Sequence, residues 1–325
     1  MLSFRHSFLQ TIFWLGLVAQ ADEPLRARQT HMGMPVDLSL YGVSASEGER
    51  VLTAFSNRVV ALEAILSGYQ SDSELRRFNA TAGRSEGVRL SQSLFHVLSF
   101  GQSLAAESKG AFDVTVGPLV QVWRLSRARG QVPSTALIEQ ARKRVGYQLV
   151  ERREFESVAV LTVPKMRIDL DAIAKGYILD EGMDVLRRHG VESALIDAGG
   201  DVRVSGPPPG RAGWTIRIGG MDGEAVVLRD AAVATSGDAV QYMEKDGVRY
   251  SHIIDPRTGW GVTNQCQATV IASTAMEADG LASWICVVGI DGASEVLKKR
   301  VRAHAVVAQG DRVWKSEGAI TRRLK

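Results

Sequence analysis

Two stretches in the first third of the chain have apolar residues at helical spacing. Residues 46–49 (SEGE) resemble a capping box, in which a serine and a later glutamate satisfy the free amides of a helix start. The helix predicted after them carries an apolar stripe of Val51, Phe55, Val59, Leu62 and Leu66. A second helix is predicted over residues 92–108, with Leu94, Val97, Leu98 and Leu104 on one face. Both stripes predict helices that face a core.

Alternating apolar and polar residues predict short strands elsewhere. A strand over residues 36–41 follows a glycine turn, and an Asp246-Gly247 turn predicts a hairpin between residues 240–245 and 248–254. Other strands are predicted over residues 148–151, 158–163, 166–170, 191–204 (with a central turn), 214–218, 225–228, 268–272 and 303–308. Strands and helices come in blocks with frequent hairpins, which predicts an α+β fold rather than a doubly wound one.

The N-terminal residues have the pattern of a secretory signal peptide. Arg5 and His6 precede an apolar run over residues 8–19, and Ala19-Gln20-Ala21 is a typical cleavage site. We expect a signal peptide over residues 1–21 and a single mature domain over residues 22–325. The alternative is an uncleaved anchor, although the run is short for a span. No other stretch approaches transmembrane length, which predicts an exported, periplasmic protein without stable membrane insertion.

Charge and cysteine content narrow the possible functions. The formal net charge is +3, which argues against a dedicated nucleic-acid surface. The two cysteines, Cys266 and Cys286, lack the spacing of a zinc or thioredoxin-like site. The two cysteines could form a disulfide. Two separate buried thiols are the preferred interpretation, because disulfide geometry is restrictive.

Residues 250–283 hold the most unusual chemistry. Asp279 and Ser283 are four residues apart on a predicted helix, where their oxygens could share a hard cation with other ligands. By spacing alone, a helix-start aspartate and an ordinary helical serine explain the pair better than a cation site does. His252 lies at a strand end near Asp255 and could act as a base or as a structural cap. Ser251 is a poor triad partner for it, because adjacent strand residues point to opposite faces.

Three further positions are ambiguous when taken singly. Lys175, at a helix start, could contact a phosphate or remain solvated. Asp113 could bind a ribose or flavin group, or cap the next turn. Tyr69 could stack on a ring or lie at the rim of the core.

Taken together, these segments resemble one family. In chain order they are Met32-Gly33, LSGYQSDSELRRFN (66–79), GAFDVTVGPLVQVW (110–123), DLDAIAKGYILD (169–180), ALIDAGGDVRVSG (194–206), TSGDAV (235–240), SHIIDPRTG (251–259) and EADGLAS (277–283). This order resembles the ApbE-type FAD:protein FMN transferases and covers nearly all of residues 22–325. The resemblance implies a single domain with mixed or antiparallel sheets flanked by helices, in two intertwined lobes.

The resemblance also implies roles for individual residues. Magnesium is expected on the Ala172 carbonyl, Asp279 and Ser283, where Ser283 replaces the threonine usual in the family. His252 matches the proposed base. Contacts to FAD are expected from Met32, Tyr69, Ala111, Phe112, Asp113, Lys175 and Ile254. Met34 departs from the threonine common after Met-Gly, a change on the flavin side of the pocket.

The implied activity is magnesium-dependent transfer of FMN from FAD to a threonine or serine of a flavoprotein, with release of AMP. The expected partner is a flavoprotein acceptor such as an electron-transfer subunit, and no nucleic acid is expected. Two alternatives use the same pocket: a magnesium-dependent FAD pyrophosphatase, and a flavin-binding maturation factor without catalysis.

Overall fold

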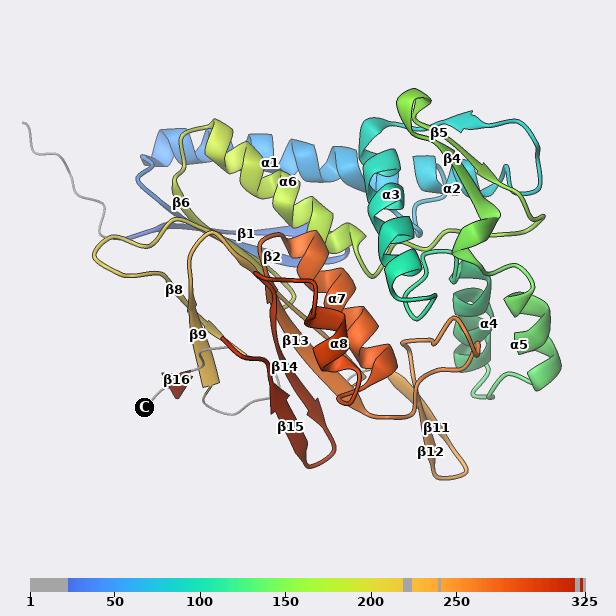
Figure 1. Cartoon of the computed structure of the whole chain (residues 1–325). Helices are drawn as coiled ribbons and strands as arrows, with labels where there is room; N and C mark the ends of the chain where they lie inside the picture. The colour runs from blue at the N-terminus through green and yellow to red at the C-terminus, as the bar shows by residue number, and fades with distance from the viewer. Residues whose placement is uncertain (1–22, 219–223, 239–240, 319–321, 324–325) are drawn as a thin grey trace, which may run out of the picture.

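An eight-stranded sheet, antiparallel throughout, organises the chain (Figure 1). The computed structural model describes residues 23–218, 224–238, 241–318 and 322–323, so the predicted signal peptide lies outside the described residues. The strand order is β1-β2-β6-β7-β10-β13-β14-β15. Their bounds are β1 Leu25–His31, β2 Met34–Tyr41, β6 Ser193–Ala198, β7 Asp201–Ser205, β10 Ala232–Gly237, β13 Cys266–Ala272, β14 His304–Gln309 and β15 Arg312–Lys315.

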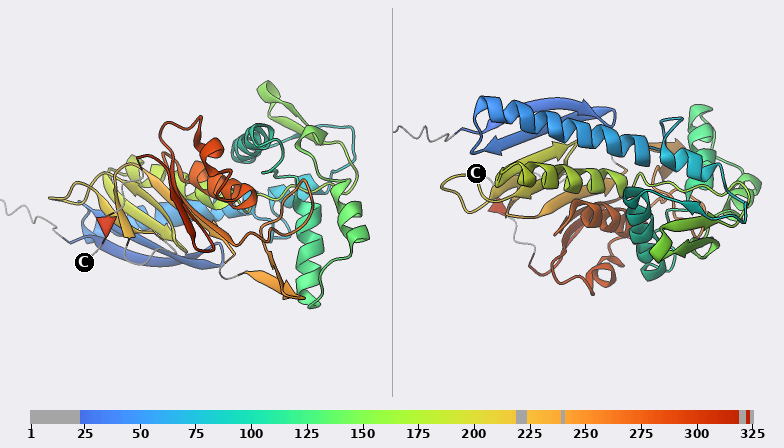
Figure 2. Two further views of the ribbon diagram at one scale, coloured as in Figure 1. Left: turned by 60° about the horizontal axis from the view of Figure 1, so that its bottom comes forward. Right: turned by 90° about the horizontal axis from the view of Figure 1, so that it is seen from above.

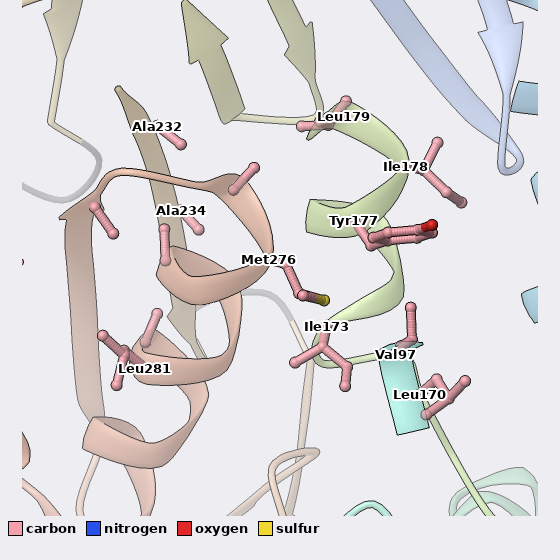
Figure 3. Packing of buried hydrophobic residues seen from close by; sticks show 14 of the residues in the cluster. Val97, Leu170, Ile173, Tyr177, Ile178, Leu179, Ala232, Ala234, Met276 and Leu281 are labelled. Carbon is pink, nitrogen blue, oxygen red and sulfur yellow. The ribbon is translucent and has the colours of Figure 1, made fainter. Parts of the chain in front are cut away.

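Three helices cover one face of this sheet, as the view from above shows (Figure 2). They are α1 (Ala45–Leu66), α6 (Ala174–Arg188) and α7 (Ala275–Val288), and the short α8 (Ala293–Leu297) follows α7. Met276 of α7 points toward Ile173 and Tyr177 at the start of α6 (Figure 3). The predicted stripe of α1 is buried at all five positions, because it packs on this sheet face.

The opposite face of the sheet carries a smaller apolar cluster. Val202, Val233 and Ile271 point to this side, and Trp214 and Ile216 of β8 pack on them. Strand β8 (Trp214–Arg217) pairs with β9 (Glu224–Leu228), which also pairs with β16 (Arg322–Arg323).

A second group of elements is inserted between α1 and α6 in the sequence. It contains α2 (Glu74–Asn79), α3 (Gln92–Glu107), α4 (Gly117–Ala128), α5 (Thr135–Arg142), the 3-10 turns Tyr147–Leu149 and Glu154–Glu156, and a small sheet of β3 (Val88–Arg89), β5 (Val158–Leu161) and β4 (Val150–Arg153). The chain leaves the large sheet after α1 and returns to it at α6. This path gives the α+β fold its two intertwined parts.

A hairpin connects the large sheet with this inserted group. Strands β11 (Tyr242–Lys245) and β12 (Val248–Ser251) pair as predicted around Asp246-Gly247, and the hairpin extends toward α4 (Figure 2). Tyr250 contacts Trp123 of α4, with ring centroids 5.6 Å apart. Helix α4 therefore lies beside the segment that leads to His252.

Several local predictions were wrong. The capping box of α1 is formed by Ser44 and Glu47 rather than by residues 46–49, because the helix begins earlier than its apolar stripe. Residues 166–170 form no strand and contribute only an isolated bridge between Arg167 and Val116. Strands β1, β3, β10, β15 and β16 were not predicted. Among the described residues, no helix has the length and apolar character of a membrane span.

Candidate functional site

The first turn of α6 meets α7 at very close range. The Gly176 amide donates a hydrogen bond to Oδ2 of Asp279 at 3.3 Å. A Cβ added at Gly176 would lie 2.3 Å from the carbonyl oxygen of Ala275, so only glycine permits this approach. The predicted ligand Asp279 is thereby held against the segment that contains Ala172 and Lys175.

Asp180 of α6 anchors the start of α7. Its two carboxylate oxygens each accept a hydrogen bond at 2.9 Å, from the amides of Ala275 and Met276. Arg203 of β7 donates to the same carboxylate at 2.9 Å. Since the first amides of a helix lack intrahelical partners, this carboxylate caps α7 and fixes its position relative to α6.

Buried charges surround Asp279. Lys175 forms an ion pair with Asp201 at 2.6 Å, and Asp279 is only 5% exposed. Burial, followed by the nearby Asp201, raises the pKa of Asp279 well above its ordinary value, although Lys175 opposes this shift. Burial alone would lower the pKa of Lys175, but Asp279 and Asp201 outweigh it and raise the pKa. Additional positive charge at this junction would stabilise both carboxylates.

The three predicted metal ligands are oxygen atoms of Ala172, Asp279 and Ser283. The Gly176 amide donates a hydrogen bond to the Asp279 carboxylate, and the Tyr177 amide donates to the Ile173 carbonyl. No backbone amide is recorded that donates to the Ala172 carbonyl in the described part of the chain. Ser283, one turn beyond Asp279, lies 3.1 Å from the hydroxyl of Ser236 on β10. No cluster of three or more His, Cys, Asp or Glu side chains suited to a metal occurs among the described residues. A carboxylate, a hydroxyl and a carbonyl nevertheless fit magnesium, which binds through few protein oxygens and retains water.

Tyr69 lies next to this junction and contacts two charged side chains, Asp171 and Arg124, which the sequence did not predict. Its hydroxyl donates to Asp171 at 2.9 Å, and Arg124 of α4 donates to both groups at 2.8 Å. Burial, followed by Asp171, raises the pKa of Tyr69 to about 12, so the phenol stays protonated. Burial, followed by Asp171, also raises the pKa of Asp169 to about 6. The ring of Tyr69 therefore has a fixed position although the residue is 71% exposed.

His252 directly follows β12, and one of its ring nitrogens forms a hydrogen bond. Its Nδ1 lies 3.0 Å from the carbonyl oxygen of Gln241, which requires a proton on Nδ1. Nε2 is then the unprotonated nitrogen of the neutral ring and can accept a proton. Burial lowers the pKa of His252, Arg127 lowers it further, and the Gln241 carbonyl and Asp238 oppose the shift. The neutral ring is thus favoured near pH 7.

The remaining predicted contact residues are distributed around the structure. Asp113 is buried and accepts hydrogen bonds at 2.7–2.8 Å from the amide and hydroxyl of Thr115 and from the Tyr147 amide. The Met32 amide donates to Glu63. Ala111, Phe112 and Ile254 are buried apolar residues. The roles of these residues in binding FAD stay predictions.

A surface depression of about 440 Å³ lies beside the His252 segment. It is lined by Tyr250, Asp255, Thr258, Trp260, Gly261, Val262, Thr263, Asn264 and Val287. None of the predicted metal ligands lines it, so it is separate from the α6–α7 junction.

Four charged residues of the site were not predicted from the sequence. Asp171, Asp180 and Asp201 belong to segments that were recognised, but nothing in their spacing revealed their partners. Arg124 occurs in an ordinary helical pattern. The two acids in Asp169-Leu170-Asp171 were the one sequence feature that could have indicated a charged site here. The two cysteines are buried free thiols, in agreement with the preferred interpretation.

Comparison with known proteins defines the class. The sequence model of the ApbE family matches residues 32–307. An FAD:protein FMN transferase of Vibrio cholerae is 33% identical over 298 residues, covering 87% of this chain and 88% of the relative. One of Treponema pallidum is 32% identical over 283 residues, covering 81% of this chain and 78% of the relative.

Solved structures agree with this assignment. The flavin transferase ApbE of Vibrio cholerae superposes with a TM-score of 0.78 at 28% identity, covering 91% of this chain and 97% of the other. The ApbE protein of Thermotoga maritima gives a TM-score of 0.81 at 29% identity, covering 91% and 97%. The chain therefore belongs to the ApbE family.

Proposed function

We propose that this protein is an FAD:protein FMN transferase that uses magnesium. It transfers FMN from FAD to a threonine or serine hydroxyl of a flavoprotein. The observation that carries the proposal is the α6–α7 junction. There the buried carboxylate of Asp279 accepts a hydrogen bond from the first turn of α6, just after Ala172, whose carbonyl accepts no recorded backbone amide in the described residues. The Ser283 hydroxyl lies one turn further along α7. Membership in a family whose named relatives are FAD:protein FMN transferases supports the same reaction.

The reaction is a phosphoryl transfer that needs no reactant besides FAD and the acceptor hydroxyl. The acceptor oxygen forms a bond to the flavin-side phosphorus of FAD, and the bond from that phosphorus to the bridging oxygen breaks. AMP leaves with the bridging oxygen, and the hydroxyl proton passes to the protein. Such reactions depend mainly on positioning and on stabilisation of developing charge.

Asp279, Ser283 and the carbonyl of Ala172 are the residues that would hold the magnesium ion. When bound, this ion supplies Lewis-acid stabilisation of phosphate oxygens. Lys175 contributes a positive charge next to these phosphate oxygens. Its ammonium group also forms an ion pair with Asp201, with 2.6 Å between Nζ and Oδ2.

His252 is suited to accept the proton of the acceptor hydroxyl. The Gln241 carbonyl fixes the Nδ1–H tautomer, which leaves Nε2 as the basic nitrogen. A positioned base of this kind contributes roughly 10²–10⁴-fold to the rate. Tyr69, held by Asp171, offers an aromatic face to the flavin side.

The decisive experiment is mass spectrometry of a candidate acceptor after incubation with this protein, FAD and magnesium. The expected result is a mass gain of one FMN on a threonine or serine, with AMP in solution. The gain should disappear with a magnesium chelator. An acceptor that remains unmodified while all components are active would contradict the proposal.

Hydrolysis of FAD to FMN and AMP is the second candidate. The exposure of Tyr69, at 71%, leaves its side of the site open to water. Incubation with FAD in the absence of an acceptor separates the two reactions, because rapid release of free FMN would favour the pyrophosphatase.

The acceptor that we propose is a flavoprotein with a threonine or serine modification site, such as an electron-transfer subunit. The signal-peptide pattern of residues 1–21 supports export of this protein to the periplasm. N-terminal sequencing of the mature protein would test that location, and a start near Asp22 is expected.

A further inference from the structure

Helix α4 carries two arginines, Arg124 and Arg127, one turn apart. At this spacing their side chains leave the same side of the helix. Arg124 is fixed over the ring of Tyr69, with its Cζ 4.8 Å from the ring centroid, and it donates to Asp171 at 2.8 Å. One nitrogen of its guanidinium makes all of these recorded hydrogen bonds, which leaves its other nitrogens available to a ligand.

Arg127 has a different environment. It is half-buried, yet no hydrogen bond or ion pair of its side chain is recorded in the described part of the chain. It lies close enough to affect two functional groups: it lowers the pKa of His252 and interacts with the Tyr69 phenol. Burial, followed by the neighbouring Arg124, lowers its own pKa. A guanidinium in this position gains stability from any anion placed beside it.

The surroundings increase this excess of positive charge. Arg76 and Arg167 both donate to the Gly68 carbonyl, at 3.5 and 3.4 Å, next to Tyr69. Arg167 interacts electrostatically with Arg124 and with Asp169 and Asp171. Four guanidiniums therefore share a region in which these two carboxylates are the recorded acidic partners.

We propose that Arg124 and Arg127 bind the phosphate groups of the flavin nucleotide, between the Tyr69–Asp171 contact and His252. This inference rests on the proposed function, because it names the donor of that reaction as the ligand. Phosphate fits better than an acidic peptide for two reasons. A phosphate group offers more acceptor oxygens and more negative charge than a carboxylate, which suits two neighbouring guanidinium groups. Arg124 also lies beside Asp171, which directly precedes the proposed metal ligand Ala172.

Binding without turnover tests this proposal independently of transferase activity. FAD, FMN and riboflavin are titrated into the full chain, and quenching of flavin fluorescence is followed in the absence of acceptor. Arg127→Gln should weaken FAD and FMN roughly 10- to 100-fold, the effect of losing a charged hydrogen bond. Riboflavin, which has no phosphate, should change less than about twofold. Arg129→Gln at the end of the same helix is the matched control, because Arg129 is exposed.

A charge-conserving variant controls for structural damage at Arg124. Arg124→Gln also removes its contacts with Tyr69 and Asp171, whereas Arg124→Lys retains the charge and should recover much of the FAD affinity. An equal loss of riboflavin and FAD binding in Arg127→Gln would overturn the proposal. So would unchanged FAD binding with an increased KM for the acceptor, which would assign the arginines to acceptor docking. If FAD binding falls as expected but no acceptor is ever modified, the proposed function fails and the phosphate site stands.

Discussion

The amide of Gly176 donates a hydrogen bond to the carboxylate of Asp279 at 3.3 Å, and this contact joins segments 103 residues apart in the chain. It places the start of α6 and the second turn of α7 around one group of oxygen donors. The geometry of the proposed metal site therefore depends on how closely these two helices pack.

Gly176→Ala should separate the two helices. Its added methyl group would lie 2.3 Å from the Ala275 carbonyl, and backbone atoms have little freedom to move away. We expect a loss of about 1–3 kcal/mol in the free energy of unfolding, together with weaker magnesium binding. Gly48→Ala in α1 is the control, because its methyl group would meet the flexible end of Leu25. Urea denaturation measures both, and equal stability of the two variants would contradict the prediction.

Asp279→Asn should separate stability from function. The amide removes a buried negative charge whose pKa is already raised by burial, so the metal-free variant should be at least as stable as the native protein. Magnesium should no longer raise its melting temperature, whereas a concentration of about 100 times Kd stabilises the native protein by about 2.7 kcal/mol. Asp311→Asn, at an exposed turn, should retain the magnesium response. Transferase activity in Asp279→Asn would refute the metal assignment.

The pH dependence of kcat/KM should report on His252. Because burial and Arg127 lower its pKa, the neutral base should persist below the ordinary value of about 6.5, and the acidic limb should lie below that pH. Arg127→Gln removes a charge that lowers this pKa, so the limb should move to higher pH. His252→Gln should reduce the rate roughly 10²–10⁴-fold with FAD binding retained. An acidic limb that stays unchanged in His252→Gln would assign it to another group.

Asp180→Asn should destabilise the attachment of α7. The substitution leaves Arg203, which is 7% exposed as a side chain, without its carboxylate. It also weakens the hydrogen bonds to the first amides of α7. We expect a loss of about 3 kcal/mol in unfolding free energy, measured in urea. Asp184→Asn on the same helix, with an exposed side chain, should cost less than about 0.5 kcal/mol.

The two cysteines should react only after unfolding. Cys286 lies against the backbone carbonyls of Cys266 and Ser236, at 3.5 and 3.3 Å, and both thiols are buried. A thiol reagent should label neither residue in the native protein and both in denaturant without reductant. If denatured, unreduced protein gave no label, the cysteines would form a disulfide instead.

The sequence predicted the helices better than the connections between elements. The stripe of α1 and the face of α3 were visible because apolar periodicity reports directly on burial. The missed strands β1 and β15 lie at the two edges of the sheet, where only one neighbour and partial burial leave a weak pattern. The missed strand β10 is central and pairs on both sides, so edge position does not explain it. The segment over residues 166–170 alternates like a strand because Met166, Ile168 and Leu170 are buried, but its recorded pairing is a single bridge to Val116.

The candidate site was predictable only through family resemblance. Spacing placed Asp279 and Ser283 on one helix, but nothing local indicated that Lys175 would pair with Asp201 or that Gly176 would bind Asp279. These contacts depend on sheet order, which brings β6, β7, β10 and β13 together from separate parts of the chain. Long-range pairing of this kind leaves little trace in a single sequence.

The long interval between Gly176 and Asp279 also affects when the site comes into existence. Its oxygen atoms come from two segments that the sheet of β6, β7, β10 and β13 brings together in the folded chain. An unfolded chain has the same residues without this arrangement of oxygen atoms. The proposed metal site is therefore complete only in the folded chain, where both segments are in place.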